Sequence, residues 1–367
     1  MDPLRIGIVG CGAISGIYLQ NLAKFRSTQV VAVADLDLDR ARQVAANNGV
    51  SHALEVDALL SHADIELVLN LTVPKAHASV ATKALLAGKH VYNEKPLTIS
   101  NEEARALVEL AASKGLLVGC APDTFLGAGQ QTCRSIVDSG AIGEVVAASA
   151  AMLCRGHETW HPSPEFYYEN GGGPMLDMGP YYVNALINLL GGAKRVCGMV
   201  RASFPTRTIT SQPKHGKVIT VETATHLTGE IEFANGAIAH LTTSFDVYAN
   251  HVQPIVIYGS EGTMLVPDPN GFDGGIQVKK AGGEFESVHL KYGFADNSRG
   301  LGVLDMAHQI RSGTKNHRAS GELAAHSLEV MNAFTTSSEE ERFVHISPLA
   351  ARPLAMDPLE FAGEVSI

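Results

Sequence analysis

The sequence predicts a two-domain α/β protein, with a Rossmann doubly wound parallel sheet followed by an α+β domain that has a large, mostly antiparallel open sheet. Over residues 4–120, short apolar runs alternate with helix-period segments, which is typical of a parallel sheet wound by helices. After about residue 122, paired strands and turns replace this alternation. Since 367 residues exceed one ordinary core, we expect domains at 1–122 and 123–367.

The composition indicates a globular protein and argues against several classes of function. Hydrophobic residues make up 45% of the chain and charged residues 18%. The net charge is −10 without any block of Lys and Arg, which disfavours a nucleic-acid groove or a polybasic membrane anchor. No apolar run approaches the roughly 20 residues of a membrane span, and the first residues lack a signal-peptide layout. We therefore expect a soluble, cytoplasmic protein.

The five cysteines favour a reducing compartment as well. Their number is odd and no two of them form a Cys-x-x-Cys pair. Neither a disulfide framework nor a structural zinc site is expected from this pattern.

The first domain can be followed element by element. A strand over Ile6–Val9 precedes a helix with an apolar face at Ile14, Tyr18, Leu22 and Phe25. Further strands are expected at Val30–Ala34, Ile65–Leu71, His90–Asn93 and Leu116–Cys120, and further helices at Asp39–Asn48, Ala76–Ala87 and from Ser100 to about Gly115. Gly49 suits a helix C-cap, and Ser100 with Glu103 forms a capping box.

The second domain shows a different pattern. A helix is expected over Gln130–Ser139 and a strand over Val145–Leu153. Glu230–Phe233 and Ala237–Ser244 predict two strands around an Asn-Gly turn. Another strand pair is expected at Ile255–Gly259 and Gly262–Val266, and another helix at Gly321–Phe334.

The segment after the first strand predicts a site for a dinucleotide. Gly10 permits a tight turn, and Gly12, Ala13 and Ile14 open a helix whose N-terminus favours a pyrophosphate. Ser15 stands where the third glycine of this motif is usual, and its small side chain still permits close packing.

An acidic residue ends the second strand and bears on the choice of cofactor. Asp35 can accept hydrogen bonds from the adenosine ribose hydroxyls, and it would repel a 2′-phosphate. This favours NAD over NADP. The alternative is that Asp35 caps the next helix, although Asp37 can also do so.

Several motifs, taken in order, resemble those of the Gfo/Idh/MocA family (glucose-fructose oxidoreductase, inositol dehydrogenase and MocA). They are Glu94-Lys95-Pro96 after a Rossmann strand, the Thr72-Val73-Pro74 turn with His77, the segment from Gly171 to Gly179, and Gly259-Ser260-Glu261-Gly262. The resemblance extends over nearly the whole chain, and the combination is more specific than any one motif.

This resemblance implies an NAD(P)-dependent enzyme for a sugar, cyclitol or related polyol. It also implies that Lys95 lies between nicotinamide and substrate, and that Asp177 binds substrate hydroxyls. Residues that would line the cofactor are Thr72, Pro74, His77, Glu94 and Lys95. Many relatives have His four residues after the acidic residue, whereas this chain has Tyr181, as does a subset that includes glucose-fructose oxidoreductase.

Hydride transfer from a carbinol carbon gives these residues distinct roles. Lys95 would hydrogen-bond the reacting oxygen and stabilise its developing charge, and Tyr181 would donate or accept the proton. Tyr181 can instead be a core aromatic next to Tyr182, and Asp177 can instead cap the helix that starts near Pro180. The three catalytic candidates are therefore Lys95, Tyr181 and Asp177.

The segment Arg155–Pro162 contains the only Trp and two His four residues apart. Because the matching loop of relatives borders the substrate, Arg155, His157, Trp160 and His161 are candidate substrate-binding residues. Trp160 suits stacking on a sugar face. Structural hydrogen bonding is the main alternative, and a metal site is disfavoured because Gly156 and Pro162 argue against a helix.

Two other functions compete with a sugar dehydrogenase. An NAD-dependent glycoside hydrolase, acting by transient oxidation, elimination, water addition and re-reduction, would need extra acid and base groups, which His157 and His161 offer. A catalytically silent NAD-binding sensor is disfavoured by the presence of Lys95, Asp177 and Tyr181. By resemblance we also expect a homodimer or homotetramer, joined through the open face of the second sheet.

Overall fold

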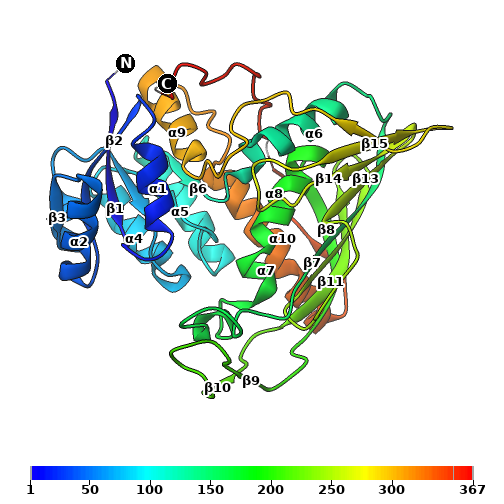
Figure 1. Cartoon of the computed structure of the whole chain (residues 1–367), viewed down its shortest axis with the longest axis horizontal. Helices are drawn as coiled ribbons and strands as arrows, with labels where there is room; N and C mark the ends of the chain where they lie inside the picture. The colour runs from blue at the N-terminus through cyan, green and yellow to red at the C-terminus, as the bar shows by residue number, and fades with distance from the viewer. Residues whose placement is uncertain (1, 350, 366–367) are drawn as a thin grey trace. The chain divides into compact units, whose positions relative to one another are not determined.

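The computed structural model describes residues 2–349 and 351–365, and the chain forms two compact units (Figure 1). The first unit comprises Met1–Gly127, Tyr292–Ala325 and Met356–Ile367. The second comprises Ala128–Lys291 and His326–Ala355. The sequence-based division into 1–122 and 123–367 differs from this one, because two later segments of the chain return to the first unit.

A six-stranded parallel sheet forms the centre of the first unit, in the order β3-β2-β1-β4-β5-β6. The strands are β1 (Leu4–Val9), β2 (Thr28–Ala34), β3 (His52–Leu54), β4 (Leu67–Asn70), β5 (His90–Asn93) and β6 (Val118–Cys120). Leu67, Val68 and Leu69 of β4 are fully buried, as expected when helices cover both faces of a sheet. This order, with β1 next to β4, confirms the predicted doubly wound fold.

Capping residues explain where two of the helices next to this sheet begin or end. They are α1 (Ser15–Leu22), α2 (Leu38–Asn48), α3 (Val56–Ser61), α4 (Pro74–Leu86) and α5 (Asn101–Ser113). Gly49 ends α2 with a φ of 66°, and the Ser100 hydroxyl accepts the Glu103 N–H (3.2 Å) at the start of α5, as predicted. The sequence analysis missed β3 and α3, because three and six residues are too few to show a period.

Later segments complete the first unit. The helix α9 (Leu301–Ser312) packs against β6, and the Cys120 N–H donates to the Ala319 carbonyl (2.9 Å). Arg318 forms ion pairs with Asp305 (2.6 Å) and Glu360 (2.7 Å). These contacts join residues far apart in the sequence, so no local pattern predicts them.

The second unit is built on a nine-stranded sheet in the order β16-β15-β14-β13-β7-β12-β11-β8-β17. Its strands are β7 (Val145–Leu153), β8 (Ala193–Arg201), β11 (His226–Phe233), β12 (Ile238–Ser244), β13 (Ile255–Gly259), β14 (Gly262–Val266), β15 (Ile276–Lys280), β16 (Glu286–Val288) and β17 (Val344–His345). β7 and β12 pair in parallel, and the other neighbours are antiparallel. The predicted large, mostly antiparallel open sheet is confirmed. A separate pair consists of β9 (Thr206–Thr208) and β10 (Val218–Thr220).

Helices cover one face of this sheet and leave the other exposed (Figure 1). The covering helices are α6 (Ala128–Asp138), α7 (Gly173–Asp177), α8 (Gly179–Leu190) and α10 (Gly321–Glu340), the last of which starts in the first unit. Along β7, Ala148, Ala150 and Met152 are buried, in the alternation that a half-covered strand requires. Met199 and Tyr258 are exposed on the sheet. Within residues 2–349 and 351–365, no helix combines the length and apolar character needed to cross a membrane.

Candidate active site

The turn between β1 and α1 depends on glycine. Gly10 has a φ of 103°, and a β-carbon there would lie 2.6 Å from the Leu71 carbonyl oxygen. Gly12 and Ala13 are exposed, and Ile14 precedes α1. The Ser15 hydroxyl donates to the Gly12 carbonyl (2.8 Å) and closes the turn. The loop backbone is thus accessible at a helix N-terminus, and these residues fit the pyrophosphate of a dinucleotide.

The Asp35 carboxylate joins this turn to the end of β2. Oδ2 accepts the Cys11 N–H (2.8 Å), and Oδ1 accepts the Asp37 N–H (2.9 Å). Asp37, in contrast, caps α2 by accepting the Arg40 N–H (3.1 Å). Capping therefore belongs to Asp37. Arg40 Nη1 also lies 3.5 Å from Asp35 Oδ1, a neighbour that the sequence analysis did not include.

Two asparagines at the ends of β4 and β5 hold the loops that follow. Asn70 Nδ2 donates to Asn93 Oδ1 (3.0 Å) and to the His77 carbonyl (3.2 Å). Asn70 Oδ1 accepts the Thr72 hydroxyl (2.7 Å), and Asn93 Nδ2 donates to the Leu97 carbonyl (2.9 Å). Both asparagines are fully buried. The sequence analysis missed them, although a polar residue at the last position of two apolar strands is a usable signal.

His77 connects the same two loops through both nitrogens of its imidazole. Its Nδ1 lies 2.6 Å from the Pro96 carbonyl oxygen and its Nε2 lies 2.9 Å from that of Thr72. Burial lowers the pKa of His77, and the two carbonyl groups oppose that shift. The residue is 0% exposed, so its imidazole lies between the two loops and is held by both. That His77 also lines the cofactor stays a prediction.

Glu94 is also occupied by protein groups. Its Oε1 accepts the Tyr18 hydroxyl (2.9 Å), and its Oε2 accepts the Lys95 N–H (2.9 Å). Burial is the main cause that raises the pKa of Tyr18, so this phenol stays a donor. The main chain at the half-buried Lys95 is therefore linked to α1 through Glu94 and Tyr18. Pro74, the other loop residue singled out, is the first residue of α4.

In the second unit, Asp177 and Tyr181 lie on either side of a break between two helices. Asp177 ends α7, and Tyr181 lies in the first turn of α8, where its N–H donates to the Met178 carbonyl (3.1 Å). The Asp177 side chain is 14% exposed and Tyr181 is 7% exposed. Met178, one residue after Asp177, is the N-cap residue of α8, and its side chain makes no capping hydrogen bond.

His157 holds the Asp177 carboxylate. Its Nε2 lies 2.9 Å from Asp177 Oδ2, and its Nδ1 accepts the indole N–H of Trp160 (3.2 Å). The imidazole packs edge-on against Tyr167 and Phe245, with ring centroids 4.3 Å and 4.7 Å away. A substrate-binding candidate and a catalytic candidate from the sequence are thereby in direct contact.

The two histidines of this loop have different hydrogen-bond partners. His161 Nδ1 accepts the Ser163 N–H (3.0 Å), and burial lowers the pKa of His161. Residues 154–163 form turns and bends, in keeping with the effect expected of Gly156 and Pro162. Within the described part of the chain, no group of three or more His, Cys, Asp or Glu side chains is placed to hold a metal ion.

Arg155 and Trp160 differ in their surroundings. The Arg155 guanidinium lies 4.6 Å from the ring centroid of Tyr248 and 5.6 Å from that of Phe204. Trp160 is 60% exposed while its N–H is used by His157, so its indole is oriented yet accessible.

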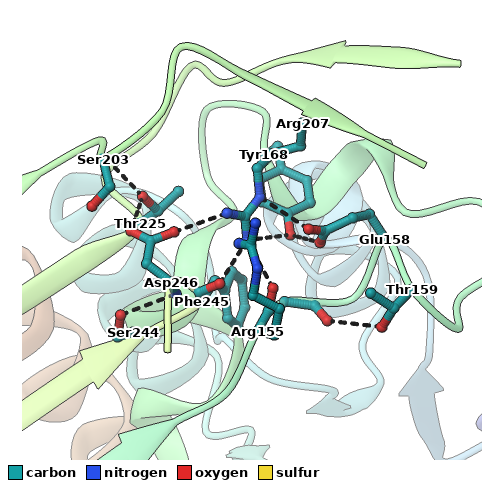
Figure 2. Close-up of polar contacts among 11 residues, drawn as sticks. Arg155, Glu158, Thr159, Tyr168, Ser203, Arg207, Thr225, Ser244, Phe245 and Asp246 are labelled. Carbon is teal, nitrogen blue, oxygen red and sulfur yellow. Dashed lines mark hydrogen bonds and ion pairs between the residues drawn. The ribbon is translucent and has the colours of Figure 1, made fainter. Parts of the chain in front are cut away.

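A buried charge cluster anchors this loop, as Figure 2 shows. Arg207 Nε lies 3.0 Å from Glu158 Oε1, and Nη1 lies 3.1 Å from Asp246 Oδ1. Arg207 Nη2 donates to the carbonyls of Arg155 (2.9 Å) and Phe245 (2.6 Å). The sequence analysis missed this cluster, because Glu158 and Arg207 are far apart in the chain and follow no motif.

The Tyr168 hydroxyl completes the cluster by donating to Glu158 Oε2. Burial raises the pKa of Tyr168 well above its ordinary value, which keeps the phenol a donor. Thr225 donates to the other oxygen of Asp246 (2.7 Å). Each buried carboxylate thus has a cation and a hydroxyl as partners.

Two segments of the chain match known families. Residues 4–121 match the oxidoreductase family with an NAD-binding Rossmann fold, and residues 130–265 match the Gfo/Idh/MocA C-terminal domain. Together these segments make up more than half of the chain.

Individual relatives agree with these matches. The dTDP-3,4-didehydro-2,6-dideoxy-alpha-D-glucose 3-reductase of Streptomyces violaceoruber is 34% identical over 54% of this chain and 57% of its own length, which is less than two thirds. The protein of the same name from Saccharopolyspora spinosa is 30% identical over 85% of this chain and 89% of its own. The structure of levoglucosan dehydrogenase in complex with NADH superposes with a TM-score of 0.82 at 19% identity, covering 95% of this chain and 100% of that one. At that identity the superposition shows a shared fold.

Proposed function

Because the chain belongs to the Gfo/Idh/MocA family of oxidoreductases, we propose that it transfers hydride between NAD and a ring hydroxyl or ketone carbon of a sugar, glycoside or cyclitol. The observation that carries this substrate class is the Asp177 carboxylate, held by His157 next to the exposed Trp160. A carboxylate accepts hydroxyl hydrogens, and an indole face packs against the C–H face of a sugar ring. Relatives named for a dTDP-sugar reductase and for levoglucosan dehydrogenase support the proposal.

The first unit is an NAD-binding Rossmann domain, and its residues fit this cofactor. Gly10, Gly12, Ala13 and Ile14 would hold the pyrophosphate, and Asp35 the adenosine ribose. Thr72 and Pro74, in the turn fastened by Asn70, would border the nicotinamide half. The bound cofactor supplies the acceptor or donor of hydride.

The protein's own side chains would handle the proton. Oxidation of a carbinol requires loss of the hydroxyl proton, and we assign its transfer to the Tyr181 phenol. The Lys95 ammonium would stabilise negative charge on the reacting oxygen. Asp177 would orient the substrate by accepting a hydroxyl hydrogen.

A panel of sugars, cyclitols and glycosides with NAD, followed by absorbance at about 340 nm, tests the proposal with three variants. Lys95→Ala should keep NAD binding and lose about 10²–10⁴-fold in turnover, and Tyr181→Phe should also lose most of its turnover. Lys83→Ala is the control, because Lys83 is an exposed residue of α4 that pairs with Asp57 (3.1 Å). Normal rates in Tyr181→Phe would make it a packing residue, and wild-type protein without turnover on any panel member would refute the function.

The glycoside hydrolase needs a separate experiment. The hydrolase reaction would need extra acid and base groups, for which His157 and His161 are the candidates. Both ring nitrogens of His157, however, make hydrogen bonds to Asp177 and Trp160. A glycoside incubated with catalytic NAD in deuterated water should yield NADH equal to product and an intact glycosidic bond. Free sugar over many turnovers, with deuterium beside the oxidised carbon and no net NADH, would establish the hydrolase instead.

We further propose that the exposed sheet face mediates self-association into a homodimer or homotetramer. Met199 is 74% exposed and Ile238 is 51% exposed on this sheet, and apolar side chains of this kind favour association. Light scattering of the wild type and of Met199→Lys tests the proposal. A monomeric wild type would refute it.

A further inference from the structure

The hydrogen bonds around His157 have a fixed direction. An indole nitrogen can only donate, so Nδ1 of His157, which receives the Trp160 N–H, carries no hydrogen. An imidazole always keeps at least one N–H, so the hydrogen is on Nε2. Nε2 therefore donates to Asp177 Oδ2 (2.9 Å), and the hydrogen bonds run from Trp160 through His157 to Asp177.

This arrangement uses the whole hydrogen-bonding capacity of the imidazole. Each ring nitrogen makes one hydrogen bond, and both are made to protein groups. His157 therefore has no nitrogen left for a substrate hydroxyl or for a second acid–base step. The contact of His157 with Asp177 can therefore affect the substrate only through the orientation of the Asp177 carboxylate.

We infer that His157 and Trp160 are positioning residues, which act on the substrate through Asp177. This inference rests on the proposed role of Asp177 in binding a substrate hydroxyl. The hydrogen bond from Nε2 fixes the rotation of the carboxylate, and the indole N–H, by donating to Nδ1, fixes the orientation of the imidazole that donates it. The carboxylate thus meets the substrate already oriented, as an acceptor.

The surroundings of His157 support a fixed imidazole. Its side chain is 12% exposed and lies between Tyr167 and Phe245. The next residue, Glu158, is anchored by Arg207. Rotation of the imidazole would break both of its hydrogen bonds, so packing and hydrogen bonding favour the same orientation.

A spectroscopic experiment tests the tautomer without any substrate. Full-length protein labelled with ¹⁵N-histidine should show His157 with hydrogen on Nε2 and none on Nδ1. Trp160→Phe keeps an aromatic ring but removes the N–H, so the ¹⁵N shift of Nδ1 should move to that of a nitrogen without a donor, while Asp177 still holds the hydrogen on Nε2. Phe245→Leu is the packing control, because it removes a ring contact without removing a hydrogen bond, and the Nδ1 shift should stay close to that of the wild type. A hydrogen on Nδ1 in the wild type, or an Nδ1 shift in Trp160→Phe equal to that of the wild type, would overturn the inference.

Kinetics test the effect on Asp177. His157→Phe removes both hydrogen bonds and should lower kcat/KM about 10- to 100-fold, whereas His157→Gln, whose amide can donate near the Nε2 position, should recover most of the loss. In an Asp177→Asn background, His157→Phe should cost little more, because a positioning residue acts only through its partner. Fully additive losses, or equal losses in the Phe and Gln variants, would show that His157 acts on the substrate directly or only as packing. If Asp177→Asn itself leaves turnover unchanged, the proposed function fails, while the tautomer result stands separately.

Discussion

The loop after β5 and the loop after β7 both carry candidate site residues, but different contacts hold them. The β5 loop, with Lys95, is fastened without an ion pair among these groups: Asn93 donates to a carbonyl, His77 contacts two, and the Glu94 carboxylate accepts a main-chain N–H and a hydroxyl. The β7 loop, with His157, is fastened by charges, since Arg207 lies between Glu158 and Asp246. The first arrangement is built on main-chain partners in the loops that follow two neighbouring strands, β4 and β5. The second depends on side chains from three separate parts of the chain.

This difference determines what a single substitution costs. Loss of one amide in the β5 network removes hydrogen bonds, which typically costs about 1–3 kcal/mol when a partner is left buried. Loss of Arg207 from the β7 cluster leaves two buried carboxylates without the cation that pairs with both, which costs more. The β7 loop should therefore be the more sensitive of the two to one substitution.

Arg207→Met is the largest expected effect on stability. The side chain of Arg207 is 2% exposed and those of Glu158 and Asp246 are 5% and 9% exposed, so the variant should lose about 3–5 kcal/mol in urea unfolding. Lys217→Met is the control, because its ion pair with Glu165 (2.8 Å) is at the surface and should contribute under about 1 kcal/mol. A loss in Arg207→Met no larger than that of the control would remove the contrast between the loops.

The same contrast explains what the sequence could and could not predict. Gly10, Gly49 and Ser100 follow short-range rules of turns and helix ends, and the structure has them in the predicted places. The parallel sheet was predictable because β1, β2, β4 and β5 alternate with helices over short distances.

The missed features depend on residues that are distant in the chain. Arg207 meets Glu158 only because β9 brings it to the loop after β7, and His157 meets Asp177 only after both loops have folded. The charge pairs of Arg318 likewise hold later segments in the first unit. Hydrophobic periodicity carries no information about such pairs. The resemblance of motifs identified Asp177 as a candidate, but it did not identify His157 as the residue that contacts its carboxylate.

A second prediction concerns acid sensitivity at the start of β5. His90 Nδ1 accepts the Leu117 N–H (3.0 Å), and burial lowers the pKa of His90 from 6.5 to about 4. As the pH falls from about 6.5 to about 4, the unfolded chain binds this proton before the folded chain does. The free energy of unfolding should therefore decrease over that interval, by up to roughly 3 kcal/mol, and then level off.

His90→Asn isolates this contribution. The Asn side-chain oxygen can still accept the Leu117 N–H, but it does not titrate, so the loss of stability between about pH 6.5 and 4 should be smaller. His215→Asn, at an exposed turn, is the matched control and should follow the wild type. Identical pH dependence of urea unfolding in all three proteins would show that His90 does not contribute.

The smallest expected effect is on cofactor binding. It tests whether the Asp35 carboxylate, which contacts the nearby glycine turn, determines the choice of cofactor in the first unit. Asp35→Ala removes the acceptor proposed for the ribose hydroxyls and leaves the Cys11 N–H without its carboxylate partner. NAD binding, measured by calorimetry, should weaken by roughly 1.5–3 kcal/mol. NADP binding should improve, because the charge that repels the 2′-phosphate is lost. Arg40, whose Nη1 lies 3.5 Å from Asp35 Oδ1 in the wild type, remains to attract that phosphate.

Asp37→Ala separates charge from position, because it removes a carboxylate that also pairs with Arg40 (3.4 Å) but caps α2 instead of contacting the glycine turn. It should keep the preference for NAD and lose only about 1 kcal/mol of stability from the missing cap. The double variant Asp35→Ala with Arg40→Ala then isolates the cation, and its gain in NADP binding should be smaller than that of Asp35→Ala alone. Unchanged NAD affinity in Asp35→Ala, or a wild-type preference for NADP, would contradict the role of Asp35. Equal gains in the single and double variants would instead show that loss of the carboxylate acts without help from Arg40.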